Sequence, residues 1–309
     1  MTTTPTRPRP ARLPGMPELP DIVVYLERLQ ALVGGRPLLR IRLASPWVLR
    51  TFDPPASAIE GKRVTGLRRI GKRLVFELED DLFVVIHLMV AGRLRMRPAG
   101  SPIPPKRGLA AFDFPDVTFL LTEEGTKKRA SIHVVRGAGA LADHDRGGVE
   151  PFAMTVEQLG DALRRERHTL KRALTDARLV SGIGGAYADE IMHRARVSPT
   201  VRTDRLGDDD VTRLHTATRE VLTEWTDRLR AEVGDGFPEK VTAFHDEMAV
   251  HGRFGKPCPV CGVPVQRIVY SSNETNYCPG CQTDGRILAD RALSRLLKED
   301  FPRTLEDLE

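Results

Sequence analysis

Four cysteines are the residues whose type and spacing most clearly indicate a chemical role. They form two C-x-x-C pairs, Cys258 with Cys261 and Cys278 with Cys281, and the 309-residue chain contains no other cysteine. Tetrahedral zinc prefers four soft ligands supplied by two such turns, so the spacing favours a zinc ribbon over a redox pair or incidental cysteines. Because four thiolates leave no open coordination position, we expect one structural Zn²⁺ ion.

The cysteines also indicate the compartment in which the protein works. A secreted scaffold would scatter its cysteines to cross-link distant loops, whereas these lie within residues 258–281, which is typical of a reducing compartment. No apolar run reaches the roughly 18 residues that a membrane span requires. We therefore expect a cytoplasmic, nucleoid-associated protein without membrane contact.

Three glycines, Gly182, Gly184 and Gly185, form a second candidate site between two helical patterns. Glycines let two backbones approach closely and expose N–H groups at the start of the following helix, which is a natural seat for a phosphate. Taken alone, the motif is more often an ordinary helical hairpin. Beside a zinc ribbon and basic strands, we interpret it as a clamp on a DNA backbone.

Charge supports this interpretation only locally. The 47 Lys and Arg against 42 Asp and Glu give a net charge of +5, which is weak evidence for a polyanionic partner. Basic residues instead gather in short runs, such as Lys72-Arg73 and Lys127–Arg129. Such runs usually form solvated faces, so they permit nucleic-acid binding without requiring it.

The N-terminal half shows the patterns of a β-sheet domain. Residues 1–15 are rich in Thr, Pro and Arg with almost nothing to bury, so we expect a disordered extension. Apolar residues at helical spacing then predict a helix over Asp21–Leu32. Strand patterns separated by turns follow, and they predict a two-layer sheet domain with a loop at 99–106. The strands are expected at Leu39–Leu43, Arg63–Leu67, Leu74–Leu78, Leu82–Leu88, Val117–Leu121 and Ser131–Val135.

Helical periodicity replaces the strand patterns after Pro151. We therefore expect a helical domain over 150–240, a ribbon over 250–283 and a helical extension over 284–309. With the sheet domain at 16–145, the chain is expected to be an α+β protein. The helices are expected at Val156–Arg165, Leu170–Asp176, Ala186–Arg196, Asp209–Val233 and Ile287–Leu297.

Five motifs, in one order, make residues 16–283 resemble the formamidopyrimidine-DNA glycosylase/endonuclease VIII family of base-excision repair enzymes. Each motif is weak alone, but the ordered set is specific. The resemblance implies an N-terminal β-sandwich, a helix–two-turn–helix domain and a zinc ribbon, with double-stranded DNA in the cleft between the lobes. The motifs are Met16-Pro-Glu-Leu-Pro20, Gly71-Lys72-Arg73, HLMVAGRL at 87–94, Gly182-Ile-Gly184 with Tyr187-Ala-Asp-Glu190, and His251-Gly-Arg253 before the cysteines.

The resemblance also implies a reaction on damaged, oxidised bases. The family flips the base out of the duplex and attacks the sugar C1′ with the nitrogen of an N-terminal proline. The resulting Schiff base allows the strand to be cut by elimination. Pro17 matches this nucleophile, Glu18 the acid/base and Lys72 the lysine near the lesion phosphate. The positions that match contacts to the DNA backbone are His87 and Lys171.

The chain departs from the family pattern at its expected nucleophile. Pro17 follows sixteen residues, so its nitrogen is a tertiary amide unless translation starts at Met16 or the protein is processed. Three hypotheses therefore stay open. The chain is a DNA glycosylase with AP lyase activity, a glycosylase that uses Glu18 and water alone, or a non-catalytic module that binds damaged DNA. In each case we expect a monomer.

Further departures lie among the expected DNA contacts and mark the chain as a divergent member. Asn273 stands where the zinc-finger arginine is usual, and Gly185 replaces an asparagine. The segment that usually supplies an aromatic wedge contains Lys127 and Arg129 instead, with Val90 near a second void-filling position. We expect both basic residues to contact DNA, since the planar Arg129 guanidinium could stack in the gap.

Overall fold

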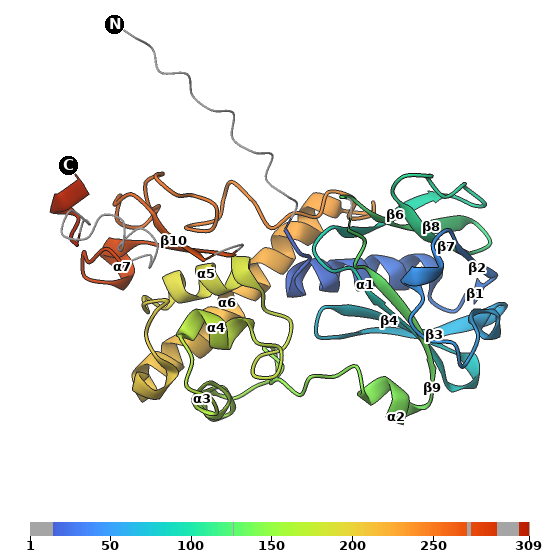
Figure 1. The fold of residues 1–309 in the computed structure, drawn as a ribbon, viewed down its shortest axis with the longest axis horizontal. Coiled ribbons are helices and arrows are strands. Elements are labelled where there is room, and N and C mark those ends of the chain that lie inside the picture. Colours follow the sequence, from blue (N-terminus) through green and yellow to red (C-terminus); the bar gives the residue numbers. More distant parts are fainter. Residues whose placement is uncertain (1–14, 126, 271–272, 289–302, 309) are drawn as a thin grey trace, which may run out of the picture.

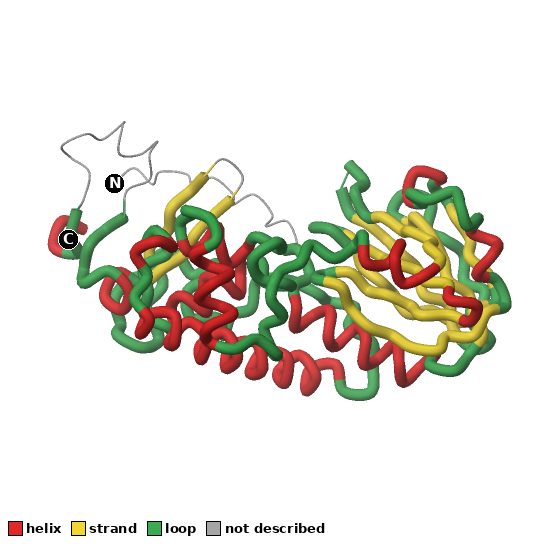
Figure 2. The backbone as a smooth tube through the Cα atoms, turned by 90° about the horizontal axis from the view of Figure 1, so that it is seen from below, coloured by secondary structure: helices red, strands yellow, loops and turns green. Residues whose placement is uncertain are grey.

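The computed structural model describes residues 15–125, 127–270, 273–288 and 303–308. The expected disordered extension therefore lies outside the described residues except for Gly15, and so does most of the helix expected at Ile287–Leu297. Figure 1 shows a β-rich lobe, a helical lobe and a small ribbon that packs on the helical lobe. Figure 2 shows the two main lobes side by side, with strands gathered in one and helices in the other.

The first lobe contains two antiparallel sheets and helix α1 (Leu19–Val33). One sheet has the order β1-β3-β4-β5-β9 and the other β2-β7-β8-β6. Their apolar faces enclose a common core, in which Phe76 stacks on Phe112 with ring centroids 6.2 Å apart. The strands are β1 (Pro37–Leu38), β2 (Arg40–Leu43), β3 (Lys62–Ile70), β4 (Arg73–Leu78), β5 (Leu82–His87), β6 (Gly92–Pro98), β7 (Gly108–Asp113), β8 (Val117–Glu123) and β9 (Ser131–Arg136).

Strands β6 and β7 are absent from the expectations drawn from the sequence. In β6, arginines at positions 93, 95 and 97 alternate with Leu94 and Met96, so the run looks charged. Arg93 is nevertheless only 4% exposed, because carbonyl oxygens accept its N–H groups. A run of arginines usually indicates a solvated face, but here Arg93 is buried with its N–H groups paired. The charge pattern therefore did not predict strand β6.

The second lobe is helical and is reached through α2 (Gly137–Ala142). Its helices are α3 (Val156–Arg164), α4 (Leu170–Thr175), α5 (Gly185–Arg194) and α6 (Asp208–Val233). These four begin and end within two residues of the expected bounds. The long α6 also packs on α1, where Arg230 and Glu27 form an ion pair with an N–O distance of 2.6 Å. Helix α6 therefore belongs to the core of the helical lobe and contacts the first lobe through α1.

The ribbon consists of the antiparallel strands β10 (Gln266–Tyr270) and β11 (Asn273–Tyr277), followed by α7 (Pro279–Gln282). Strand β11 packs on α5 of the helical lobe. The described part of the C-terminal extension returns to the ribbon, since the Leu288 N–H donates to the Tyr277 hydroxyl at 2.7 Å. Among the described residues, no helix is long and apolar enough to cross a bilayer.

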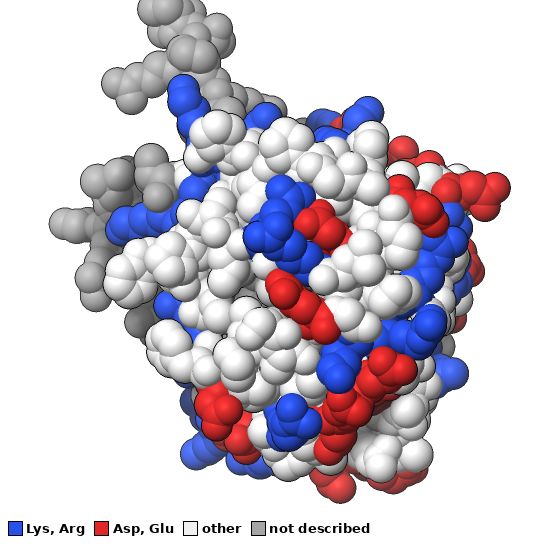
Figure 3. All heavy atoms as spheres, turned by 90° about the vertical axis from the view of Figure 1, so that its right-hand side faces the viewer, with Lys and Arg blue, Asp and Glu red and all other residues white. Residues whose placement is uncertain are grey.

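Basic and acidic side chains are mixed at the outer end of the β-rich lobe. In Figure 3 basic and acidic side chains lie interspersed on this face. Ion pairs in this lobe, such as Arg42 with Asp113 at 2.6 Å, occupy basic residues of the strands. The face shown therefore offers no continuous basic surface for a polyanion.

Candidate active site and zinc centre

Glu18 lies between the two lobes, directly before α1, with 3% of its surface exposed. Its carboxylate accepts hydrogen bonds from the backbone N–H groups of Gly184, Ala186 and Tyr187 at 2.7, 3.0 and 3.3 Å. A further backbone bond, from the Leu19 N–H to the Gly182 carbonyl at 3.0 Å, joins the same two segments. The glycine turn and the N-terminus of α5 therefore hold a carboxylate of the protein itself.

The three positions of this turn differ in whether the structure requires glycine there. At Gly184 an added Cβ would lie 2.4 Å from Glu18 Cδ, so only glycine lets the carboxylate reach the amides. Gly182 has φ of +77°, which favours glycine. At Gly185 an added Cβ would meet nothing within 4 Å. The first two positions build the junction, whereas the third has room for a side chain.

Lys72 reaches the same turn from the other lobe, in the tight connection between β3 and β4. Its ammonium group donates to the Ile183 carbonyl at 3.1 Å. Burial lowers the pKa of Lys72, while the nearby Glu18 and Asp21 act in the opposite direction. The structure thus brings Glu18 and Lys72, two of the three residues expected to be catalytic, together on one glycine turn.

Asp21 is a buried acid of this site that was not among the expected functional residues. It accepts the backbone N–H of Glu18 at 2.8 Å and is 4% exposed. Burial raises the pKa of Asp21 to about 7, against the hydrogen bond from Glu18. An acid three residues after the residue that precedes a helix is a typical capping pattern, so the sequence did contain a signal for it.

A cavity of about 460 Å³ opens beside Lys72 between the lobes. Four basic side chains line it, of which Arg146 and Arg172 are exposed. His87 also lines it, and its Nδ1 accepts the Met89 N–H at 3.0 Å. Burial, together with Arg73 and Lys72, lowers the pKa of His87 to about 4. Asp145 and Asp176 also line the cavity, but the four basic side chains outnumber them, so the cavity suits an anionic group such as a phosphate.

Pro17 is buried next to Glu18, and its nitrogen is joined to Met16 in a peptide bond. Gly15, the residue before Met16, is also fixed, since Arg93 Nη2 donates to its carbonyl at 2.8 Å. Arg93 Nε donates in addition to the Val241 carbonyl at 3.0 Å. Pro17 therefore lies where the resemblance expects the nucleophile, but in this chain its nitrogen has no free lone pair.

The remaining expected DNA contacts are spread over the molecule. Lys127 and Arg129 are exposed in the loop before β9, and the buried Glu123 carboxylate anchors this loop through the Arg129 N–H at 2.8 Å. Val90 is 37% exposed. Asn273 is the first residue of β11, and its side chain lies outside the described part of the chain. None of these positions contributes to the junction at Glu18.

Lys171 has partners within the protein. Its ammonium group binds Asp189 Oδ1 at 2.5 Å and the Glu274 carbonyl at 2.9 Å, and so connects α4 to α5 and to the ribbon. Asp189 is fully buried and also binds His251 Nδ1 at 2.9 Å. Burial alone would raise the pKa of Asp189, but Lys171 and His251 outweigh it and hold that pKa below its usual value.

Glu190 supplies a second connection between α5 and the segment before the ribbon. Its carboxylate accepts the N–H groups of Ala249, Val250 and His251 at 2.8–2.9 Å. Burial raises the pKa of Glu190 despite these three amides. Two adjacent acids of α5 thus fix the chain that leads into the cysteine pairs.

The four cysteine side chains converge as a zinc site requires. The Sγ atoms of Cys258 and Cys281 lie 3.9 Å apart, and those of Cys261 and Cys278 lie 3.3 Å apart. A tetrahedral zinc ion with Zn–S bonds of about 2.3 Å separates its sulfurs by about 3.8 Å. The donor set therefore fits one structural zinc ion bound by four thiolates, as the sequence predicted.

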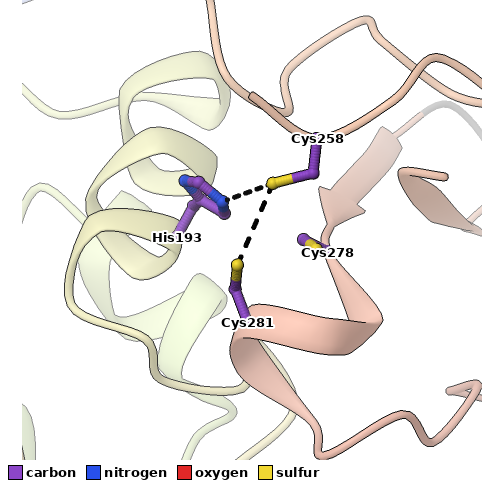
Figure 4. A group of neighbouring side chains, drawn as sticks. All are labelled: His193, Cys258, Cys278 and Cys281. Atoms are coloured by element: carbon purple, nitrogen blue, oxygen red, sulfur yellow. Dashed lines mark hydrogen bonds between the residues drawn. The ribbon is translucent and has the colours of Figure 1, made fainter. Parts of the chain in front are cut away.

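His193, near the C-terminal end of α5, lies against this cluster (Figure 4). Its Nε2 is 3.3 Å from Cys258 Sγ, and it falls within 4.8 Å of the Cys278 and Cys281 sulfurs as well. The residue is 5% exposed. No sequence pattern indicates this contact, because 65 residues separate His193 from Cys258.

Three family models cover this architecture in order. The formamidopyrimidine-DNA glycosylase N-terminal domain matches residues 16–133, its H2TH domain matches 148–230, and the zinc finger found in FPG and IleRS matches 255–283. The three elements of the fold, in this order, define a DNA glycosylase of the helix–two-turn–helix type.

Individual proteins agree with these models. The formamidopyrimidine-DNA glycosylase of Thermus thermophilus is 32% identical over 290 residues, which cover 87% of this chain and all of that protein. Its crystal structure superposes with a TM-score of 0.73 over 86% of this chain and 98% of that one. The Listeria monocytogenes relative of the same name is 28% identical over 86% of this chain and all of its own length. The chain therefore belongs to the formamidopyrimidine-DNA glycosylase family, whose members are base-excision DNA glycosylases with characteristic AP lyase activity.

Proposed function

We propose that this chain excises an oxidised base from duplex DNA and then cleaves the strand at the abasic site through a Schiff base. One observation carries the proposal: Pro17 and Glu18 lie at the junction of the lobes, where three backbone amides fix the Glu18 carboxylate beside Lys72. Solved relatives support the choice of ligand. One neighbour by fold, the Lactococcus lactis protein with a TM-score of 0.75, is a complex with DNA that contains an abasic site.

The residues at the junction have distinct roles in this reaction. The Pro17 nitrogen bonds to C1′ of the flipped nucleotide, while the base leaves with the electron pair of the glycosidic bond and takes up a proton. Glu18 moves protons at the sugar as its ring opens and the iminium forms. Loss of a C2′ proton then expels the 3′ phosphate. Lys72, at the edge of the basic cavity, binds the phosphate of the damaged nucleotide.

This reaction requires a free Pro17 nitrogen. A tertiary amide has no lone pair to offer, so the active form begins at Pro17, after translation from Met16 and removal of that methionine or after processing. The family match from residue 16 onward supports this start. A free α-amino group titrates near about 8, so a useful fraction is unprotonated at neutral pH.

One observation favours a second candidate, a glycosylase that uses Glu18 and water without a covalent intermediate. Arg93 binds the Gly15 carbonyl at 2.8 Å, and Met16 is half-buried, so these two residues before Pro17 have a defined place in the fold. A protein that retains them can still release a base. It cannot form a Schiff base through Pro17.

Borohydride trapping on a duplex with one abasic site separates the two candidates. We expect the form that begins at Pro17 to be trapped covalently, and the form with residues 1–16 intact to give no trapping through Pro17. Equal trapping by an extended form, with its N-terminus verified by mass spectrometry, would exclude Pro17 as the nucleophile. Lys72 would then be tested first, because burial already lowers its pKa.

We further propose that the protein binds DNA as a monomer and associates with the nucleoid. Contacts to phosphates come from Lys72, His87 and Lys171, with Lys127 and Arg129 contributing from their exposed loop. Asn273 and the glycine turn contribute without charge. Binding through phosphates weakens steeply with salt. An affinity for duplex DNA that stays constant between low and high salt would contradict this mode of binding.

A further inference from the structure

Helix α5 contacts both functional regions of the molecule, and its two ends differ in what they present. The N-terminal end offers backbone N–H groups to Glu18. The opposite end offers the imidazole of His193 to Cys258, with Nε2 and Sγ 3.3 Å apart. Figure 4 shows His193 pointing from the helix toward the cysteine sulfurs.

Four thiolates around one zinc ion leave two negative charges on the site, mainly on the sulfurs. Donors that reach such sulfurs stabilise them and orient them for the metal. His193 is buried and its Nε2 approaches Cys258 Sγ, while the Val260 N–H reaches the same sulfur at 3.5 Å. The Cys258 sulfur therefore has a backbone N–H donor on one side and an imidazole nitrogen on the other.

We propose that His193 is a positioning residue of the zinc site, whose Nε2–H donates to the Cys258 thiolate and joins the ribbon to α5. The four cysteines already complete a tetrahedral set, so the imidazole lies outside the coordination shell. The contact adds to the connections through Asp189 and Glu190, which fix the chain before the ribbon to the same helix. A consequence for DNA binding rests on the proposed function.

The test compares three variants with matched chemistry. His193→Phe keeps a flat ring without a donor, and His193→Gln keeps an N–H donor of similar reach. His215→Phe is the control, since the His215 Nε2 contacts the Met154 carbonyl rather than a cysteine. Each variant is first checked for one equivalent of zinc and for an unchanged circular dichroism spectrum.

Zinc release to a chromogenic chelator is the main readout. Loss of an outer partner of a metal ligand typically weakens metal binding by about 10–100-fold. We expect His193→Phe to release zinc about tenfold faster or more, while His193→Gln and His215→Phe stay close to the unaltered protein. Equal release rates for His193→Phe and the unaltered protein would overturn the proposal.

Two spectroscopic measurements keep the proposal testable even if His193→Phe folds poorly. With cobalt in place of zinc, the unaltered protein and His193→Gln should show the same four-thiolate spectrum. With ¹¹³Cd, the unaltered protein should show a four-thiolate shift and a scalar coupling from the His193 ring N–H through sulfur. A spectrum or shift of three thiolates and one nitrogen would make His193 a ligand and overturn the outer role.

The part played by the ribbon in DNA binding is measured separately, with a duplex that contains a tetrahydrofuran abasic analogue. We expect His193→Phe to bind it more weakly than His215→Phe does. Faster zinc release with unchanged affinity for this duplex would show that the zinc ribbon is not needed for DNA binding, and would leave the role of His193 at Cys258 intact.

Discussion

The two ends of helix α5 serve different chemistry by different means. At its start, backbone N–H groups hold the Glu18 carboxylate, which depends on glycine at position 184 to come within 2.7 Å. Near its other end, the side chain of His193 contacts a thiol of the ribbon. The first contact depends on the absence of a side chain and the second on the identity of one.

This difference determines how each end tolerates change. A backbone seat is lost when any Cβ fills the space, whatever the residue type. A side-chain contact is lost when the donor is removed but is kept by another donor of similar reach. The variants below use this contrast to separate the two ends.

The largest effect is expected at the metal. Cys281→Ser should remove zinc, unfold the ribbon and weaken binding to an abasic duplex by about 100-fold or more, because structural zinc sites contribute folding energy directly. Zinc content by mass spectrometry and a binding titration measure this. Val260→Ser, an exposed position between the first two cysteines, is the matched control. Retention of zinc by Cys281→Ser would show that this cysteine is not a ligand.

A pH-dependent change in stability is expected from Asp21. Its pKa in the folded protein is about 7 instead of 3.8, so between these values the unfolded chain binds fewer protons. The favourable contribution is therefore complete below about pH 4 and is lost as the pH rises through 7. Asp21→Asn retains an acceptor for the Glu18 N–H, and its unfolding free energy should exceed that of the unaltered protein by about 2–4 kcal/mol at pH 8. Melting curves at pH 5 and pH 8 test this, and a difference that does not grow with pH would contradict it.

Gly184→Ala should damage the seat of Glu18. Overpacking of this kind costs about 1–3 kcal/mol, and base release should fall by roughly tenfold or more as the carboxylate is displaced. Gly185→Ala is the matched control in the same turn, where an added Cβ meets nothing within 4 Å. Equal rates of base release from the two variants would show that the turn does not position Glu18.

The smallest effect is expected at Gly185 itself. Gly185→Asn places an amide at the start of α5, where space is open. One added hydrogen bond to a phosphate contributes about 0.5–1 kcal/mol, so affinity for an abasic duplex should rise about two- to fivefold. A binding titration at fixed salt measures it, with Gly185→Ala as reference. Equal affinity of the asparagine and alanine variants would place this residue away from the DNA.

Much of the fold could be predicted because periodicity and turn residues are local signals. The four helices of the second lobe, the approximate positions of six strands of the first lobe and the zinc ligands follow from spacing along the chain. Strand β6 was missed, because three arginines made the segment look solvated. Arg93 is buried through hydrogen bonds to carbonyl oxygens that are distant in the sequence, such as that of Val241.

The candidate site shows the same limit. Pro17, Glu18 and Lys72 were predicted from motifs, and their catalytic roles stay predictions. No local pattern indicates that Gly184 must admit the Glu18 carboxylate across 166 residues of sequence. Lys171 was expected to face DNA, and the structure adds its partners Asp189 and Glu274, which depend on the packing of three elements. Its contact with DNA stays a prediction, as do those of His87 and Arg129.

The most direct test of the account is Glu18→Gln, measured on two substrates with the protein that begins at Pro17. Release of the base from a duplex with one formamidopyrimidine lesion should fall by about 100-fold or more, because the acid/base group is removed. Strand cleavage at a preformed abasic site should persist in part, since no glycosidic bond remains to be broken. Glu27 is an exposed acid in α1, the helix that Glu18 precedes. Glu27→Gln should match the unaltered protein on both substrates. Unchanged base release by Glu18→Gln would contradict the claim that the carboxylate held by α5 takes part in the reaction.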